Sequence, residues 1–89
     1  MNISLGDNVR CGANTLITDT DWHTDDSRAG ENAPVSIGNN VWLGVDVIVL
    51  KGVTIGENTV VGAGSIVTRS LPENVYAAGI PAVVVSENR

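Results

Sequence analysis

The single histidine of the chain, His23, lies in its most acidic stretch and is the side chain best suited to acid–base chemistry. Residues 18–34 hold five carboxylates and one arginine, a local charge of -4 that leaves -1 for the rest of the chain. An imidazole titrates near neutral pH, and nearby carboxylates raise its basicity and orient its ring. Such a histidine can equally be a surface residue, and its neighbours can be solvated loop charges. These neighbours are Asp19, Asp21, Asp25 and Asp26.

A metal site is the weaker interpretation of the same stretch. The segment from Asp19 begins with Asp-x-Asp, as calcium loops do, but its sixth position is Thr24 instead of glycine and its twelfth is Gly30 instead of glutamate. A single histidine also excludes a zinc site that is built from three histidines. We therefore predict that the protein uses no metal.

A repeat of six residues organises most of the chain and must position this stretch. Aliphatic or thiol residues recur at nine positions, glycine follows in six of the nine cases, and Asn, Asp or Gly stands three residues later in seven. These last residue types tolerate positive φ, so each hexad carries its own tight corner. The nine positions are Leu5, Cys11, Ile17, Ile37, Leu43, Val49, Ile55, Val61 and Val67.

A period of six predicts an all-β fold, a parallel β-helix. An α-helix would need apolar residues three and four apart, and a hairpin sheet would need longer alternating strands. Short strands that each turn the same way instead wind into a solenoid whose coils stack about 4.8 Å apart. A second inward position, four residues after the first, is small or apolar in eight of nine hexads, with Asp21 as the exception.

The repeat is interrupted once, between Ile17 and Ile37. Twenty residues separate these positions where six would continue the repeat, so an insertion of fourteen residues is present. A long loop inside a compact repeat usually carries function. We predict one domain over residues 1–89, with an inserted loop at about 18–34 and a C-terminal extension at 73–89.

Length and charge restrict partners and location. Eighty-nine residues with 3 % aromatics, no Phe and one cysteine give a small core and no internal disulfide, so self-association is expected to supply further burial. A net charge of -5 argues against a nucleic-acid or anionic-membrane surface. The sequence shows neither a signal-peptide pattern at Met1 nor an apolar run long enough to span a membrane, so a cytoplasmic location is expected.

Four segments together resemble the hexapeptide-repeat acyltransferases, most closely the maltose and galactoside O-acetyltransferase branch. The resemblance covers nearly the whole chain and implies a left-handed β-helix of triangular section, with three hexads per turn, that assembles as a homotrimer. It also implies acetyl-CoA as the acyl donor and a sugar or similar small hydroxyl compound as the acceptor. The segments are residues 37–44, 52–58, 61–69 and 78–82.

The resemblance also gives His23 a role. In this family the insertion lies at the same place in the repeat, and its histidine is the general base that takes a proton from the acceptor hydroxyl as the oxygen attacks the thioester. A positioned base of this kind contributes about 10²- to 10⁴-fold to the rate. Asp21 and Asp25 are expected to bind the acceptor, and the acidity of the loop favours a neutral or cationic one.

A cofactor groove is implied along the corners of the coils. The backbone N–H groups of Val45 and Ala63 are expected to bind the acyl and pantetheine amides, with Gly64 beside them and Trp42 as a wall. Trp42 is equally consistent with burial by a neighbouring subunit, and Ala63 and Gly64 with simple filling of the corners. The nucleotide end of the groove is expected at Thr68, Arg69, Gly79, Ile80 and Pro81.

Two departures from the family pattern bear on activity. Arg69 stands where the family usually has lysine, and residues 83–86 lack the basic residues often found there, so weak phosphate affinity is expected. The family also has well over a hundred residues before this part, including a coil with an oxyanion-stabilising asparagine, and the chain resembles its C-terminal half. Losing one oxyanion donor typically costs about 10²- to 10³-fold.

Two other functions remain open from the sequence. One is a non-catalytic trimeric β-helix module, or a truncated acetyltransferase, that at most binds CoA. The other is acetylation of an amino group on a nucleotide sugar or of an antibiotic hydroxyl, which would use the same groove with a different acceptor.

Overall fold

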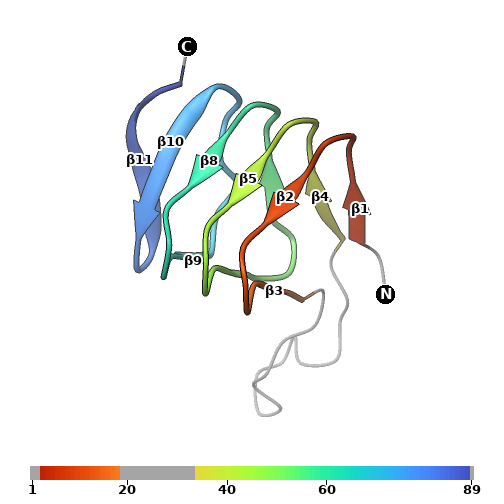
Figure 1. The fold of residues 1–89 in the computed structure, drawn as a ribbon, viewed down its shortest axis with the longest axis horizontal. Helices are drawn as coiled ribbons and strands as arrows, with labels where there is room; N and C mark the ends of the chain where they lie inside the picture. The colour runs from red at the N-terminus through yellow and green to blue at the C-terminus, as the bar shows by residue number, and fades with distance from the viewer. Residues whose placement is uncertain (1–2, 19–33, 89) are drawn as a thin grey trace.

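The structure is a computed structural model that describes residues 3–18 and 34–88, and these residues form eleven strands in three sheets and no helix (Figure 1). Sheet A contains β1 (Ile3–Leu5), β4 (Val35–Ile37) and β7 (Thr54–Ile55). Sheet B contains β2 (Arg10–Cys11), β5 (Trp42–Leu43), β8 (Val60–Val61), β10 (Val75–Gly79) and β11 (Ala82–Glu87). Sheet C contains β3 (Leu16–Ile17), β6 (Ile48–Val49) and β9 (Ile66–Val67). The predicted all-β class is confirmed.

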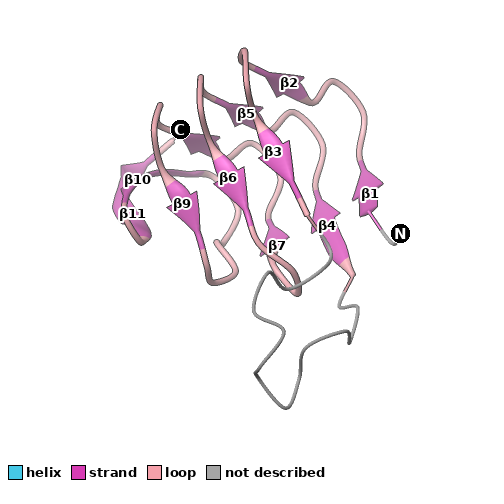
Figure 2. Cartoon of the chain, turned by 90° about the horizontal axis from the view of Figure 1, so that it is seen from below, coloured by secondary structure: helices cyan, strands magenta, loops and turns pink. Residues whose placement is uncertain are grey.

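The chain visits sheets A, B and C in turn and then begins again, so three coils stack as a solenoid. We name them coil 1 (residues 3–18), coil 2 (35–52) and coil 3 (53–70). Every strand pairing between successive coils is parallel, for example Leu43 beside Val61 and Val49 beside Val67. Figure 2 shows the strands of sheet C standing side by side across the three coils. This is the parallel β-helix that the period of six predicts.

The corners between sheets use the residue types that the repeat places there. Asn40 and Asp46 both have φ of 60°, and Gly52 has φ of 75°. The corners also stack closely, because a Cβ added to Gly44 would lie 2.8 Å from the backbone N of Ala63 in the next coil. The glycine of this hexad is therefore required by the spacing between coils.

The core fills the space enclosed by coils 2 and 3. Both inward positions of each hexad are buried there, including the polar Thr59 and Ser65. The Thr59 hydroxyl donates to the Pro72 carbonyl oxygen (2.7 Å), and the Ser65 hydroxyl oxygen accepts the Gly79 N–H (3.0 Å). The buried apolar residues of these coils are Val35, Ile37, Val41, Leu43, Val47, Val49, Val53, Ile55, Val61 and Val67.

Coil 1 follows the same path with little burial. Leu5 is 54 % exposed although its partner in sheet A, Ile37, is 2 % exposed. Cys11 is exposed, whereas its partner in sheet B, Leu43, is fully buried. The strands of coil 1 are the edge strands of all three sheets in the part of the chain that the structure describes. One face of this coil is therefore uncovered there.

The C-terminal extension leaves the repeat. Strand β10 continues sheet B parallel to β8, and β11 turns back and pairs with β10 in antiparallel fashion (Figure 1). The Ile80–Pro81 peptide in the intervening turn is cis. Within residues 3–18 and 34–88, no helix is long and apolar enough to cross a membrane.

Candidate functional site

The sequence-predicted catalytic residue His23 and the predicted acceptor ligands Asp21 and Asp25 lie outside the described residues. The strand register nevertheless fixes where the interruption falls. Ile17 pairs with Val49 and Ile37 pairs with Ile55, so a step of twenty residues from Ile17 to Ile37 corresponds to a step of six from Val49 to Ile55. The interruption therefore lies at the corner between sheets C and A of coil 1, which we name the CA corner.

The corner between sheets B and C, the BC corner, carries the predicted pantetheine-binding amides. In coil 2 the Gly44 N–H donates to the Val61 carbonyl oxygen (2.9 Å), and the Asp46 N–H donates to the Ala13 carbonyl oxygen (2.9 Å). Val45 lies between them, and its N–H takes part in none of the backbone hydrogen bonds between described residues.

Coil 3 repeats this arrangement. Gly62 and Gly64 donate to the carbonyl oxygens of Ala77 (2.8 Å) and Val45 (2.8 Å), while the N–H of Ala63 between them is likewise outside the described backbone ladder. Val45 is 46 % exposed and Ala63 is exposed. The two N–H groups therefore form a pair of donors one coil apart along the same edge.

Gly64 and the C-terminal turn extend this edge. Gly64 has φ of +75°, and a Cβ built on it would meet nothing within 4 Å, so the surface at this corner is open. The Gly79 N–H donates to the Ser65 hydroxyl (3.0 Å), which ties the turn containing Pro81 to the BC corner of coil 3. The structure thus brings Val45, Ala63, Gly64, Gly79 and Pro81 to one edge of the solenoid.

The other two predicted nucleotide ligands lie elsewhere. Thr68 and Arg69 are exposed at the CA corner of coil 3, beyond strand β9. An extended chain rises about 3.3 Å per residue, so the four steps from Gly64 to Thr68 span about 13 Å. Within one chain, these residues do not meet the BC edge that they were expected to complete.

Trp42 lies on the outer face of sheet B and is 55 % exposed. It pairs with Arg10 in coil 1 and with Val60 in coil 3. The side chain lines an open pocket of about 390 Å³ between the AB corner, where sheet A passes into sheet B, and the outer face of sheet B. Sequence analysis did not place Arg10 beside Trp42, because thirty-two residues separate them.

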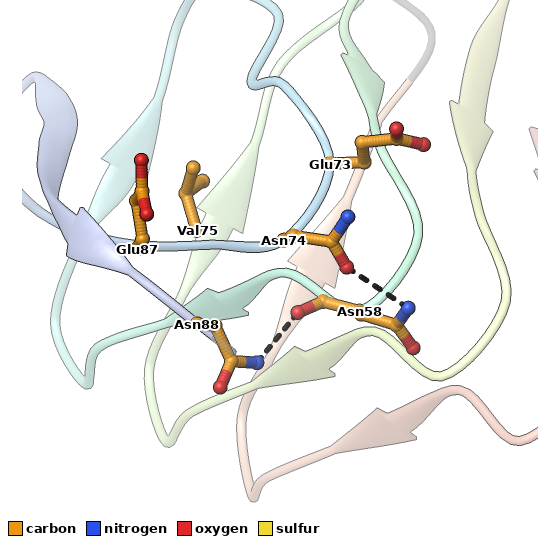
Figure 3. Close-up of a pocket in the computed structure, with 6 residues that line it drawn as sticks. All are labelled: Asn58, Glu73, Asn74, Val75, Glu87 and Asn88. Atoms are coloured by element: carbon orange, nitrogen blue, oxygen red, sulfur yellow. Dashed lines mark hydrogen bonds between the residues drawn. The ribbon is translucent and has the colours of Figure 1, made fainter.

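A second open pocket, also absent from the sequence-based expectations, lies at the AB corner of coil 3 (Figure 3). The side-chain amides of the pocket form hydrogen bonds with one another and with the backbone. Asn58 Nδ2 donates to Asn74 Oδ1 (3.0 Å), and Asn88 Nδ2 donates to the Asn58 carbonyl oxygen (2.7 Å). Figure 3 shows the Glu73 carboxylate pointing away from Glu87. The described residues contain no cluster of three or more His, Cys, Asp or Glu suited to a metal ion. The hydrogen bonds of Asn58 with Asn74 and Asn88 fasten the C-terminal segment to coil 3.

Comparisons with known proteins agree with the geometry. The family model for bacterial transferase hexapeptide (six repeats) matches residues 34–69. The galactoside O-acetyltransferase of Escherichia coli (strain K12) is 46 % identical over 89 residues, covering 96 % of this chain and 44 % of that protein. The galactoside O-acetyltransferase of Lactococcus lactis subsp. lactis (strain IL1403) is 49 % identical over 88 residues, covering 93 % of this chain and 42 % of that protein. The chain thus spans less than half the length of these relatives.

Solved structures extend the similarity to the fold. A galactoside acetyltransferase in complex with coenzyme A matches with a TM-score of 0.88 and 42 % identity, covering 98 % of this chain and 46 % of that one. A maltose O-acetyltransferase from Clostridium difficile 630 matches with a TM-score of 0.70 and 30 % identity, covering 99 % of this chain and 67 % of that one. The predicted left-handed sense of the β-helix is thereby confirmed. The chain belongs to the hexapeptide-repeat acyltransferase family, in the branch of the galactoside and maltose O-acetyltransferases.

Proposed function

We propose that this protein is an acetyl-CoA-dependent O-acetyltransferase that acts on a sugar or similar small hydroxyl acceptor, with His23 as the general base. The observation that carries the proposal is the open BC edge, where the N–H groups of Val45 and Ala63 stand outside the described backbone ladder. Relatives named galactoside O-acetyltransferase, and a related structure in complex with coenzyme A, support the same donor and reaction class.

The proposed reaction requires the acceptor hydroxyl to lose its proton. The neutral imidazole of His23 takes the proton from the acceptor hydroxyl while the oxygen attacks the thioester carbonyl carbon. The tetrahedral species then collapses, the C–S bond breaks, and the sulfur leaves as the thiolate and takes up a proton to give the free CoA thiol. A hydroxyl is a poor nucleophile at neutral pH, so this base is expected to contribute about 10²- to 10⁴-fold.

The BC edge suits the pantetheine arm of the donor. This arm is a neutral chain with two amides, and backbone N–H groups can bind its carbonyl oxygens without a charged side chain. Val45 and Ala63 offer such donors one coil apart, and the open surface at Gly64 lets the arm approach the backbone. Trp42 is proposed as the wall on the sheet B side.

A homotrimer would complete this site. Thr68 and Arg69 lie at the CA corner, about 13 Å of extended chain from Gly64, and the segment that carries His23 joins coil 1 at the same kind of corner. A trimer in which the CA corners of one subunit face the BC edge of the next would bring the two groups together.

The outward rows of the three sheets support such packing. The row on sheet A is small and hydroxylic, the row on sheet B combines an arginine with large apolar side chains, and the row on sheet C is entirely large and apolar. A large apolar row such as that on sheet C favours coverage by another subunit. The rows are Ser4, Ser36 and Thr54 on sheet A, Arg10, Trp42, Val60 and Tyr76 on sheet B, and Leu16, Ile48 and Ile66 on sheet C.

Release of free CoA thiol from acetyl-CoA, measured with a thiol reagent and a panel of sugars, tests the proposal. His23→Ala is expected to lower kcat by about 10²- to 10⁴-fold, while the molar mass in solution stays that of a trimer. An unchanged rate would remove His23 from the mechanism, and a well-folded monomer by light scattering would contradict the shared site.

The groove has its own test. Ala63→Leu is expected to weaken CoA binding at least tenfold because the longer side chain covers the edge beside its own N–H. Glu57→Leu is the matched control, since Glu57 occupies the same place in the hexad at the AB corner of coil 3 and follows a glycine in the same way. Equal affinities of the two variants by calorimetry would mean that the groove is misplaced.

A non-catalytic module that binds CoA is the second candidate function. The BC edge supports it as well, because the N–H groups of Val45 and Ala63 would bind CoA whether or not the acetyl group is transferred. Saturable CoA binding without transfer to any acceptor would establish the module and reject the enzyme.

A further inference from the structure

The open pocket beside Trp42 is the feature that the proposed function leaves without a role. Asn8, Arg10, Asn40, Val41, Trp42 and Val60 line it. Its volume of about 390 Å³ falls within the range of about 300–1,000 Å³ that is usual for small-molecule sites. It lies on the outer face of sheet B and includes the same Trp42 that forms the wall of the proposed donor groove.

Strand register holds the two largest side chains of the pocket next to each other. Arg10 and Trp42 are direct partners in the parallel pair β2–β5, and neighbouring strands lie about 4.8 Å apart. Both point outward, because side chains alternate along a strand and Leu43, the residue after Trp42, is fully buried.

The corner supplies the polar rim. Asn8 and Asn40 both have φ of 60°, and the Asn40 N–H donates to the Asp7 carbonyl oxygen (2.8 Å), so the two corners are fixed one above the other. Each carboxamide carries both donors and an acceptor. Two asparagines, a tryptophan and an arginine thus line one open space.

We propose that this pocket binds the acceptor, as a sugar that carries an anionic group. The exposed ring of Trp42 offers a flat apolar surface for the C–H face of a sugar ring, and the carboxamides can bind its hydroxyls. The planar guanidinium of Arg10 matches a carboxylate or a phosphate in a bidentate manner. This inference rests on the proposed function, because it makes the pocket the acceptor end of the donor groove.

The distribution of cations supports an anionic ligand at this place. The described residues hold three Lys or Arg, of which Lys51 and Arg69 lie at CA corners and Arg10 alone lies on sheet B. Asp7 belongs to the same corner as Asn8 but does not line the pocket. The acidic loop around His23 favours a neutral or cationic acceptor instead, so the two features predict opposite selectivity.

A panel of acceptors distinguishes these two predictions of selectivity. It contains glucuronic acid, glucose 6-phosphate, glucose and glucosamine, each assayed with acetyl-CoA. We expect kcat/KM for at least one anionic sugar to exceed that for glucose about tenfold, and the two anionic arms tell a carboxylate from a phosphate. Arg10→Gln is expected to remove this preference, and Arg10→Lys to keep part of it. Lys51→Gln, which removes the same charge at a CA corner, is the matched control and is expected to keep the preference.

Binding without turnover keeps the pocket testable if no acetyl transfer is found. Glucuronic acid or glucose 6-phosphate is titrated against the protein without acetyl-CoA, with calorimetry as the readout and Trp42→Ala and Arg10→Gln as variants. Saturable binding that both variants weaken about tenfold would support the pocket even if the proposed activity fails. Equal kcat/KM for glucose and both anionic sugars, a preference for glucosamine, or binding that neither variant changes would overturn the inference.

Discussion

Coil 1 and coil 2 carry the same repeat and the same backbone, but they bury very different amounts of surface. Leu5 and Ile37 are partners in sheet A, and they are 54 % and 2 % exposed. Asn8 and Asn40, at the following corners, have the same φ of 60°.

The difference separates two properties of a hexad. The path of the backbone is local, because residues such as Asn at a corner adopt positive φ wherever the hexad stands. Burial depends on having a coil on both sides, and the described chain covers coil 1 on one side only.

The largest contrast is expected from truncating an inward side chain in each coil. Leu43→Ala should lower the free energy of unfolding by about 2–5 kcal/mol, because Leu43 is fully buried and a cavity remains. Leu5→Ala should lower it by about 1 kcal/mol or less, since half of this side chain already meets solvent. Urea unfolding of the two variants measures the difference, and equal losses would mean that coil 1 is covered in solution.

Glycine substitutions are expected to give a smaller contrast. Gly44→Ala should destabilise by about 1–3 kcal/mol, because the added Cβ would meet the backbone N of Ala63 at 2.8 Å. Gly12→Ala should destabilise less, although its Cβ would meet the Val45 N at 2.7 Å, since no other coil of the described residues packs on the far side of coil 1. Thermal unfolding compares them, and a larger loss for Gly12→Ala would show that coil 1 is held as firmly as coil 2.

Corner asparagines are expected to show no contrast between the coils. Asn8→Ala and Asn40→Ala should each lower the free energy of unfolding by roughly 1 kcal/mol, because a left-handed residue with a Cβ is strained to the same extent in either coil. The glycine variants at these positions should recover most of the loss. A much larger loss at Asn40 would show that the corner depends on its neighbours as well as on its own φ.

The outward serines of sheet A should have the smallest effect. Ser4→Ala and Ser36→Ala are expected to change the free energy of unfolding by no more than about 0.5 kcal/mol, since both side chains are exposed. Chemical denaturation at several protein concentrations checks this, and a concentration-dependent loss in Ser36→Ala alone would place that face in a subunit contact.

Much of the fold was predictable from local pattern. The corner positions with positive φ, such as Asp46, Gly52 and Gly64, follow directly from the residue types in the repeat. The hairpin of β10 and β11 did not follow, because residues 75–87 lie outside the repeat and pair in antiparallel fashion. The different exposure of Leu5 and Ile37 did not follow either, because the hexad is the same and only stacking distinguishes them.

The residues of the proposed site were named from the sequence, whereas the arrangement of those that are described comes from the structure. Val45 and Ala63 recur at equivalent places in successive coils, so spacing alone brings them to one edge. Arg69 belongs to the same family motif, but the turn at each corner carries it to the other side of sheet C. His23 remains a prediction, as it lies outside the described residues.

The sequence by itself determined the coil, since a period of six with a corner residue in each hexad leaves the backbone few other paths. Only the tertiary structure decided which side chains share a surface, because contacts between coils depend on how many residues each turn contains. Arg10 and Trp42 are neighbours across thirty-two residues, whereas Trp42 and Val60 are neighbours across eighteen. The first interval includes the interruption, so the partner of Arg10 emerges only when the coils are stacked.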